Sequence, residues 1–152
     1  MSGSELRHDV AAWVRKAELD RGIALSVDRF LFSDGVCFHS QQCIEKYLKA
    51  ILVAHDEVPE RIHDLVVLGT EASDYYPRIA GVLEGLSFLN PFSVLIRYPD
   101  KDTDPDEAEE AIEVMERVRA VLRQVLGLED ADEEAEDELG EHDNEDDDDS
   151  GD

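Results

Sequence analysis

The fold is decided by the stretch Phe38-His39-Ser40-Gln41-Gln42-Cys43-Ile44-Glu45-Lys46-Tyr47-Leu48-Lys49-Ala50, whose apolar residues have the spacing of a buried amphipathic helix. The side chains expected in the core are those of Cys37, Ile44, Tyr47, Leu48 and Ile51. Gln42, Glu45 and Lys49 are three and four residues apart, so they share another face, beside Lys46. A polar stripe on so apolar a helix is the first candidate for a functional surface.

Helical spacing continues on both sides of this stretch. Helices are expected over about Ser4–Val27, Gly35–Ala54, His63–Tyr75, Arg78–Leu89 and Pro105 to the glycine at 127. The chain shows no strand pattern and no internal repeat. Helices joined by short connectors predict an all-α fold, an antiparallel bundle of four to five helices.

The clearest boundaries are those of the last helix. Asp104 is expected to cap it, Pro105 to occupy its first position and Gly127 to end it. Asn90 and Pro91 predict a stop and a restart, with Asn90 as the cap. The histidine at 63, at the start of the third helix, is assigned to capping rather than to catalysis.

Charge divides the chain into two parts. Residues 129–152 hold 16 acidic residues and no Lys or Arg, and they are too poor in apolar side chains to offset the entropy of ordering. A helical domain over 4–128 and a disordered acidic tail over 129–152 are therefore expected. The tail suits solubility or salt adaptation, and a partner-binding role is the alternative. The low lysine content is compatible with a salt-loving source.

The first 128 residues carry 23 acidic and 14 basic residues, a net charge of −9, which repels a phosphate backbone overall. Nucleic-acid binding would therefore need a local basic site. The chain has no run of some 18 apolar residues, so no membrane span is predicted. Its polar N-terminus lacks a signal-peptide core. A cytoplasmic protein is therefore expected.

Metal, cofactor and thiol chemistry are not indicated. The histidines have no ligand spacing such as HExxH, and no glycine-rich phosphate loop or nucleophilic Ser or Cys motif occurs. Cys37 and Cys43 are six residues apart on one helix and face different directions, so they are expected to be small buried free thiols. We expect no metal and no cofactor.

The corner Arg97-Tyr98-Pro99-Asp100 is the second candidate site. The residue before a proline avoids helix, so this segment is expected to be a fixed, extended turn. Arg97 suits bidentate contact with phosphate or carboxylate. The alternative is structural: Arg97 and Asp100 would satisfy a loop and a helix end while Tyr98 packs.

Together these segments resemble the HEPN domain, a small α-helical family named for higher eukaryotes and prokaryotes nucleotide-binding. The resemblance covers about residues 7–127. It rests on Trp13-Val14-Arg15-Lys16-Ala17-Glu18, on the 38–50 stretch, on His63-Asp64-Leu65, on Arg97-Tyr98-Pro99-Asp100 and on the closing acid-rich helix. The 38–50 stretch looks like the family signature FxxQQxxEKxLKA.

The resemblance implies a bundle of four to five helices that commonly forms a two-fold homodimer. Many prokaryotic members are encoded beside a minimal nucleotidyltransferase and act with it as a toxin–antitoxin pair. Active toxins of the wider group are metal-independent endoribonucleases with an Arg-x(4–6)-His motif. This chain departs from that motif, because the first His after Arg97 is His142. Without that imidazole, the sequence offers no obvious group to move protons in RNA cleavage, and it disfavours an enzyme.

Three functions stay open at this stage. The favoured one is a non-catalytic HEPN protein that binds a nucleotide such as ATP or GTP, a partner minimal nucleotidyltransferase, or both. Its candidate ligand-binding residues are Gln42, Glu45, Lys46, Lys49, Arg97, Tyr98 and Asp100. Lys46, Lys49 and Arg97 would hold phosphate. Tyr98 would stack on a base, to which Gln42 would hydrogen-bond.

The second function is a divergent HEPN endoribonuclease toxin, and RNA is a partner only in that case. Arg97 would stabilise the scissile phosphate, and Asp100 or His63 would carry the proton. The third is a purely structural oligomerisation module. In that case the polar face with Glu45 and Lys49 would bind another subunit through ion pairs of these two residues.

Overall fold

A computed structural model describes residues 6–128, and the prediction of a tail over 129–152 falls outside this range. The described part is all-helical, which confirms the predicted fold class. Its elements are α1 (His8–Ser26), α2 (Ser33–Ala54), α3 (Leu65–Tyr75), the 3-10 helix η2 (Pro77–Val82), α4 (Leu83–Leu89), α5 (Phe92–Leu95) and α6 (Pro105–Val125).

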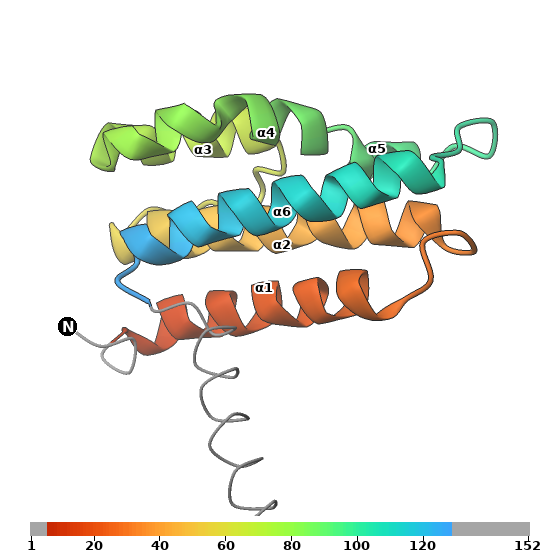
Figure 1. Ribbon diagram of the computed structural model, residues 1–152. Helices are drawn as coiled ribbons and strands as arrows, with labels where there is room; N and C mark the ends of the chain where they lie inside the picture. Colours follow the sequence, from red (N-terminus) through yellow and green to blue (C-terminus); the bar gives the residue numbers. More distant parts are fainter. Residues whose placement is uncertain (1–5, 129–152) are drawn as a thin grey trace, which may run out of the picture.

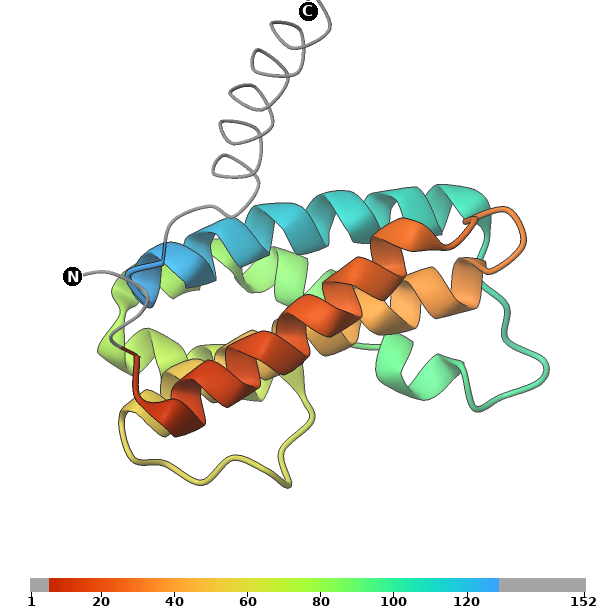
Figure 2. The same ribbon diagram turned by 90° about the horizontal axis from the view of Figure 1, so that it is seen from below.

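The long helix α2 runs through the middle of the bundle. Figure 1 shows α1 on one side of α2, with α6 beside it and α3 and α4 on the opposite side from α1. Helices that follow each other closely in sequence, α1 and α2 or α3 and α4, run antiparallel, whereas α6 runs in the direction of α2. Figure 2 shows α1 crossing α2 obliquely. The central position of α2 explains its apolar composition, since it is packed on several sides at once.

The core consists of the apolar side chains that α2 presents to its neighbours. Cys37, Ile44, Tyr47, Leu48 and Ile51 are all fully or almost fully buried, as their spacing predicts. They join residues such as Leu65, Leu86, Met115 and Leu122 from α3, α4 and α6 in one cluster. Cys37 and Cys43 are buried free thiols, as expected.

The start of α6 has the cap that the sequence predicts, whereas α3 is capped by Asp64 in place of the expected His63. Asp104 accepts a hydrogen bond from Glu107 N at 2.8 Å, and the Glu107 side chain accepts one from Asp104 N at 3.2 Å, so α6 begins with a complete capping box. The Asp64 carboxylate accepts hydrogen bonds from Val66 N and Val67 N and caps α3. Gly127 has a φ of 77° just after α6, the left-handed conformation that ends helices.

Three local predictions were wrong. Asn90 does not cap the helix that follows it; its Oδ1 accepts a hydrogen bond from Leu65 N at 2.8 Å and so joins α4 to the start of α3. The expected helix 78–89 is divided into η2 and α4. The helix α2 begins at Ser33, two residues before the expected start at Gly35, and the side chains of Ser33 and Asp34 are hydrogen-bonded to Thr103.

Candidate functional site

The polar stripe of α2 is divided by the packing of the neighbouring helices. Glu45 and Lys49 lie in the protein interior, with side chains 5% and 3% exposed. Lys46 points to the α1 side and keeps 25% of its side chain exposed, and Gln42 is half-buried. The face that looked continuous in the sequence therefore consists of two separate polar groups.

The first group is centred on the Glu45 carboxylate. Its oxygens bind Lys49 Nζ at 3.0 Å, His63 Nδ1 at 3.1 Å and Gln41 Nε2 at 3.2 Å. Because a buried carboxylate is costly unless it is paired and hydrogen-bonded, these contacts are what allow Glu45 to be buried. Gln42 Nε2 donates to Gln41 Oε1 at 2.7 Å, which extends the network toward solvent.

The Lys49 ammonium group contacts three different parts of the protein. Besides Glu45, its Nζ donates to the Glu60 carbonyl at 3.2 Å and lies 5.5 Å from the centre of the Trp13 ring. The group thus ties α2 to the 59–64 loop and to α1. His63, which was expected to act as a cap, instead binds Glu45 while 65% of its side chain remains exposed. The cap is its neighbour Asp64.

The second group joins α1 to α2, and of its members sequence reasoning identified Lys46 but missed Asp20 and His39. The buried Asp20 binds His39 Nδ1 at 2.7 Å through one oxygen and Lys46 Nζ at 2.5 Å through the other. A carboxylate only accepts hydrogen bonds, so Nδ1 carries the proton and Nε2 is left as the second nitrogen of a partly exposed ring. The spacing of His39 and Lys46 shows that they share a helix face, but nothing local places Asp20 opposite them.

A third polar network is structural. Arg119 on α6 donates to Glu18 on α1 at 2.8 and 2.9 Å, and the Tyr47 hydroxyl donates to Glu18 at 2.5 Å. Burial raises the pKa of Glu18, but the hydrogen bonds from Arg119 and Tyr47 outweigh it and leave that pKa below its usual value. Burial and the hydrogen bond to Glu18 raise the pKa of Tyr47. Arg119 is a buried cross-link between α6 and α1.

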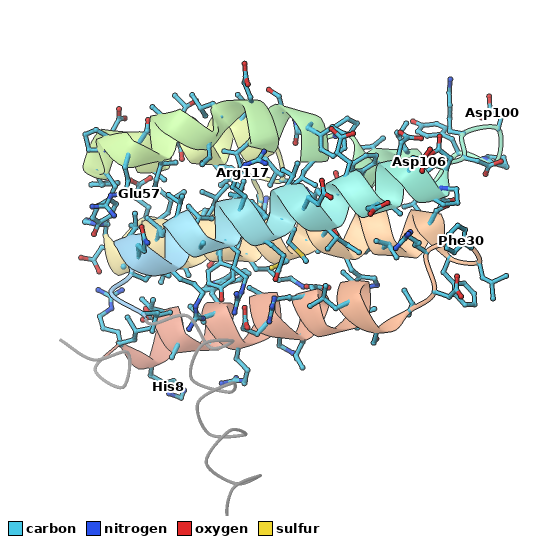
Figure 3. All side chains as sticks on the ribbon, viewed as in Figure 1. His8, Phe30, Glu57, Asp100, Asp106 and Arg117 are labelled. Carbon is cyan, nitrogen blue, oxygen red and sulfur yellow. The ribbon has the colours of Figure 1, made fainter. Side chains whose placement is uncertain are left out.

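The corner at 97–100 is arranged quite differently. Arg97, Tyr98 and Asp100 are exposed, and within residues 6–128 no hydrogen bond or ion pair involves their side chains. The following loop is fastened to the start of α2, where Thr103 N and Oγ1 both donate to Asp34 Oδ1, at 2.9 and 2.7 Å. Figure 3 shows Asp100 at one extreme of the bundle.

The structure therefore does not gather all seven candidates in one place. Glu45 is twelve residues beyond Ser33 on α2, about 18 Å along the helix axis. The structure brings Glu45 and Lys49 together and keeps Gln42 and Lys46 on the same helix. Asp100 lies in the loop that Thr103 joins to Asp34 at the start of α2.

Residues 6–128 contain no group of three or more His, Cys, Asp or Glu side chains arranged to hold a metal ion. Burial raises the pKa of Cys37 to about 12 and also raises that of Cys43, so neither thiol is primed as a nucleophile. Within the same range, no helix is long and apolar enough to cross a membrane.

Comparison with known proteins identifies the family. The model of the HEPN domain matches residues 10–125, which include every described helix except the first two residues of α1. Neither a curated protein nor a solved structure matches the chain. Since the family model covers most of its length, the chain belongs to the HEPN domain family.

Proposed function

We propose that this HEPN domain protein is a binding module that takes a nucleotide such as ATP or GTP, a partner minimal nucleotidyltransferase, or both. The observation that carries the proposal is the free corner: Arg97, Tyr98 and Asp100 are exposed and have no side-chain partner within residues 6–128. An unpaired guanidinium is suited to phosphate, and an exposed phenol ring can stack on a base. Asp100 can accept a hydrogen bond from a ribose hydroxyl.

The four α2 candidates divide into two roles under this proposal. Gln42 and Lys46 keep part of their side chains accessible on α2, apart from the corner, and would contact a partner protein there. Glu45 and Lys49 are engaged with each other and with His63, so they would hold the surface in shape.

The test is equilibrium binding of ATP and GTP to the full chain by calorimetry. We expect saturable binding that falls at least tenfold in Arg97→Ala, because the phosphate loses a charge-assisted contact of about 1.4 kcal/mol or more. Arg61→Ala is the matched control, an exposed arginine in another loop. Equal affinity in Arg97→Ala and Arg61→Ala, or no binding at millimolar nucleotide, would refute the nucleotide proposal.

A second candidate, the metal-independent endoribonuclease toxin, is favoured by one observation. His63 and His39 are each bonded through Nδ1 to a buried carboxylate, the arrangement that fixes an imidazole for proton transfer. Either ring would act as the proton carrier in place of the histidine of the Arg-x(4–6)-His motif, which this chain does not have. Incubation with a structured RNA tests this: cleavage by the wild type that is lost in His63→Ala or His39→Ala, and in Arg97→Ala, supports it. Intact RNA from folded protein rejects it.

Action as a toxin–antitoxin pair and assembly as a homodimer remain proposals that rest on the family. Growth arrest on expression, relieved by co-expression of a nucleotidyltransferase encoded nearby, would support the pair. The purely structural alternative has less support, because Glu45 and Lys49 bind each other within α2 and have little charge to offer another subunit. A double substitution of both residues that changes the mass of the assembly would favour it.

A further inference from the structure

The turn between α1 and α2 carries three consecutive large apolar side chains that face solvent. Phe30, Leu31 and Phe32 are 69%, 75% and 56% exposed. Isolated exposed apolar residues are common, but a contiguous run on one protruding turn marks an interaction site or an aggregation risk. Figure 3 shows Phe30 at the same end of the bundle as Asp100 and Asp106. We call residues 28–34 the apolar tip.

The apolar tip is held in this exposed position by its own hydrogen bonds. The Asp28 side chain accepts from Phe30 N at 2.7 Å and Leu31 N at 3.2 Å, and Phe32 N donates to the Asp28 carbonyl at 2.8 Å. Near the other end of the tip, Ser33 Oγ donates to the Thr103 carbonyl at 3.1 Å. A turn fixed at both ends presents its side chains with a small entropic cost on binding, which is the property of a preorganised contact surface.

Two surface hollows flank the tip. One, of about 250 Å³, is lined by Leu25, Val27, Asp28, Arg29, Phe30 and Ile112. The other, of about 440 Å³, is lined by Leu31, Phe32, Ser33, Asp34, Gly35, Asp102 and Thr103. A hollow on each side of an apolar ridge can receive apolar side chains from a docked segment, as helices and grooves do in known complexes.

The surroundings of the tip are acidic. The tip and the adjacent residues 100–107 together hold seven acidic and two basic residues, a net charge of −5. Arg29 is the basic residue in the tip, and it is partly engaged with Glu109 at 3.6 Å and with the Phe30 ring at 4.9 Å. An acidic rim around an apolar ridge complements a partner that has apolar side chains on one face and Lys or Arg beside them.

The same charge argues against two other occupants. A second copy would bring two tips of net charge −5 together, and residues 129–152 of this chain are acidic without a single Lys or Arg. Both would be repelled. We propose that the apolar tip is a docking surface for a cationic amphipathic segment of another protein, whose apolar face packs on Phe30, Leu31 and Phe32 and whose Lys and Arg side chains meet the acidic rim.

The probe is a synthetic amphipathic helical peptide with Leu on one face and Lys on the other, titrated into the isotope-labelled full chain. We expect amide shifts concentrated in residues 25–35 and 102–112. The variant Phe30→Ser/Leu31→Ser/Phe32→Ser should bind at least tenfold more weakly. Should that variant not fold, Leu31→Ser alone serves, because its side chain is the most exposed of the three. Val58→Ser, an equally exposed apolar residue elsewhere, is the matched control and should leave binding unchanged.

Each further outcome decides the proposal. A peptide with Glu in place of Lys should bind at least tenfold more weakly, and Asp102→Asn/Asp106→Asn should reduce the salt dependence of the Lys peptide. Shifts confined to residues 129–152, or equal binding by the triple variant, would overturn it. A wild-type dimer that becomes monomeric in the triple variant would also overturn it, because the tip would then join copies of this chain.

Discussion

Asp20 and His39 are nineteen residues apart in sequence, yet Asp20 Oδ1 lies 2.7 Å from His39 Nδ1 across the contact between α1 and α2. The other Asp20 oxygen holds Lys46 at 2.5 Å, so one buried carboxylate fixes two side chains of α2. This contact makes α1 part of the polar face of α2. Any ligand that reaches Lys46 or His39 meets groups whose positions depend on α1.

We predict that Asp20→Asn destabilises the protein by about 1–3 kcal/mol, because Lys46 and His39 lose a shared charged acceptor in a buried position. Urea unfolding of the full chain, followed by circular dichroism, measures the change. Asp74→Asn is the control: this exposed aspartate on α3 should change the free energy of unfolding by less than about 0.5 kcal/mol. A similar small change in Asp20→Asn would contradict the prediction.

The acid sensitivity of the protein should depend on Glu18. Its pKa is held below the usual value in the folded state, so the unfolded state binds the proton more readily in the window below about pH 4.3. The contribution of Glu18 to the free energy of unfolding is therefore fully present above that pH, and it is lost as the pH falls through the pKa of Glu18 in the folded state. Other carboxylates that repel one another will respond in the opposite sense, so the comparison must be with a variant.

Glu18→Gln isolates the contribution. Between pH 6 and pH 3, we expect the difference in unfolding free energy between wild type and Glu18→Gln to shrink as the wild type protonates Glu18. Urea unfolding at several pH values measures it, with Glu113→Gln, an exposed glutamate on α6, as the control. A difference that stays constant over the whole pH range would show that the Arg119 and Tyr47 contacts do not lower the pKa of Glu18.

Gly69 and Gly22 should respond to alanine in opposite directions. A Cβ on Gly69 would lie 2.3 Å from Leu86 Cδ1, so Gly69→Ala forces a buried leucine to move and should cost about 1–3 kcal/mol. Nothing lies within 4 Å of a Cβ on Gly22, which is exposed within α1. Gly22→Ala should therefore stabilise the protein by about 0.5–1 kcal/mol through helix propensity. Thermal unfolding of the two variants side by side checks both signs; equal shifts would contradict the packing of α3 on α4.

Ser40 should tolerate loss of its hydroxyl. Its Oγ is buried and has no hydrogen-bond partner within residues 6–128. Removing an unsatisfied polar atom from a core costs little or is favourable, so Ser40→Ala should leave the free energy of unfolding unchanged or raise it by up to about 1 kcal/mol. Chemical denaturation gives the sign. A loss above 1 kcal/mol would mean that the hydroxyl makes a contact in solution.

The sequence predicted what local rules decide. The Asp104 cap, the glycine that ends α6 and the buried side of α2 all follow from spacing and residue type within one helix. Asn90 was misassigned because its amide is used by Leu65, twenty-five residues away. The division of the polar stripe of α2 into two groups could not be predicted for the same reason. Its partners Asp20, His63 and the Glu60 carbonyl come from other parts of the chain.

Site prediction had a similar limit. Helical spacing identified Glu45 and Lys49 as a pair but could not show that packing would bury both. The HEPN resemblance is confirmed by the family match over residues 10–125. Residue type and the proline identified Arg97–Asp100 as a candidate, but its exposure is a property of the folded loop. His39 had no motif, because its role depends on a carboxylate from α1.

Amide shift mapping of the isotope-labelled full chain with ATP and with GTP tests the central claim most directly. We predict saturable shifts that include residues 96–101 and disappear in Arg97→Ala, while Arg61→Ala behaves like the wild type. Saturable shifts that leave residues 96–101 unaffected would contradict the corner as the nucleotide site. No shifts at millimolar nucleotide would contradict nucleotide binding itself.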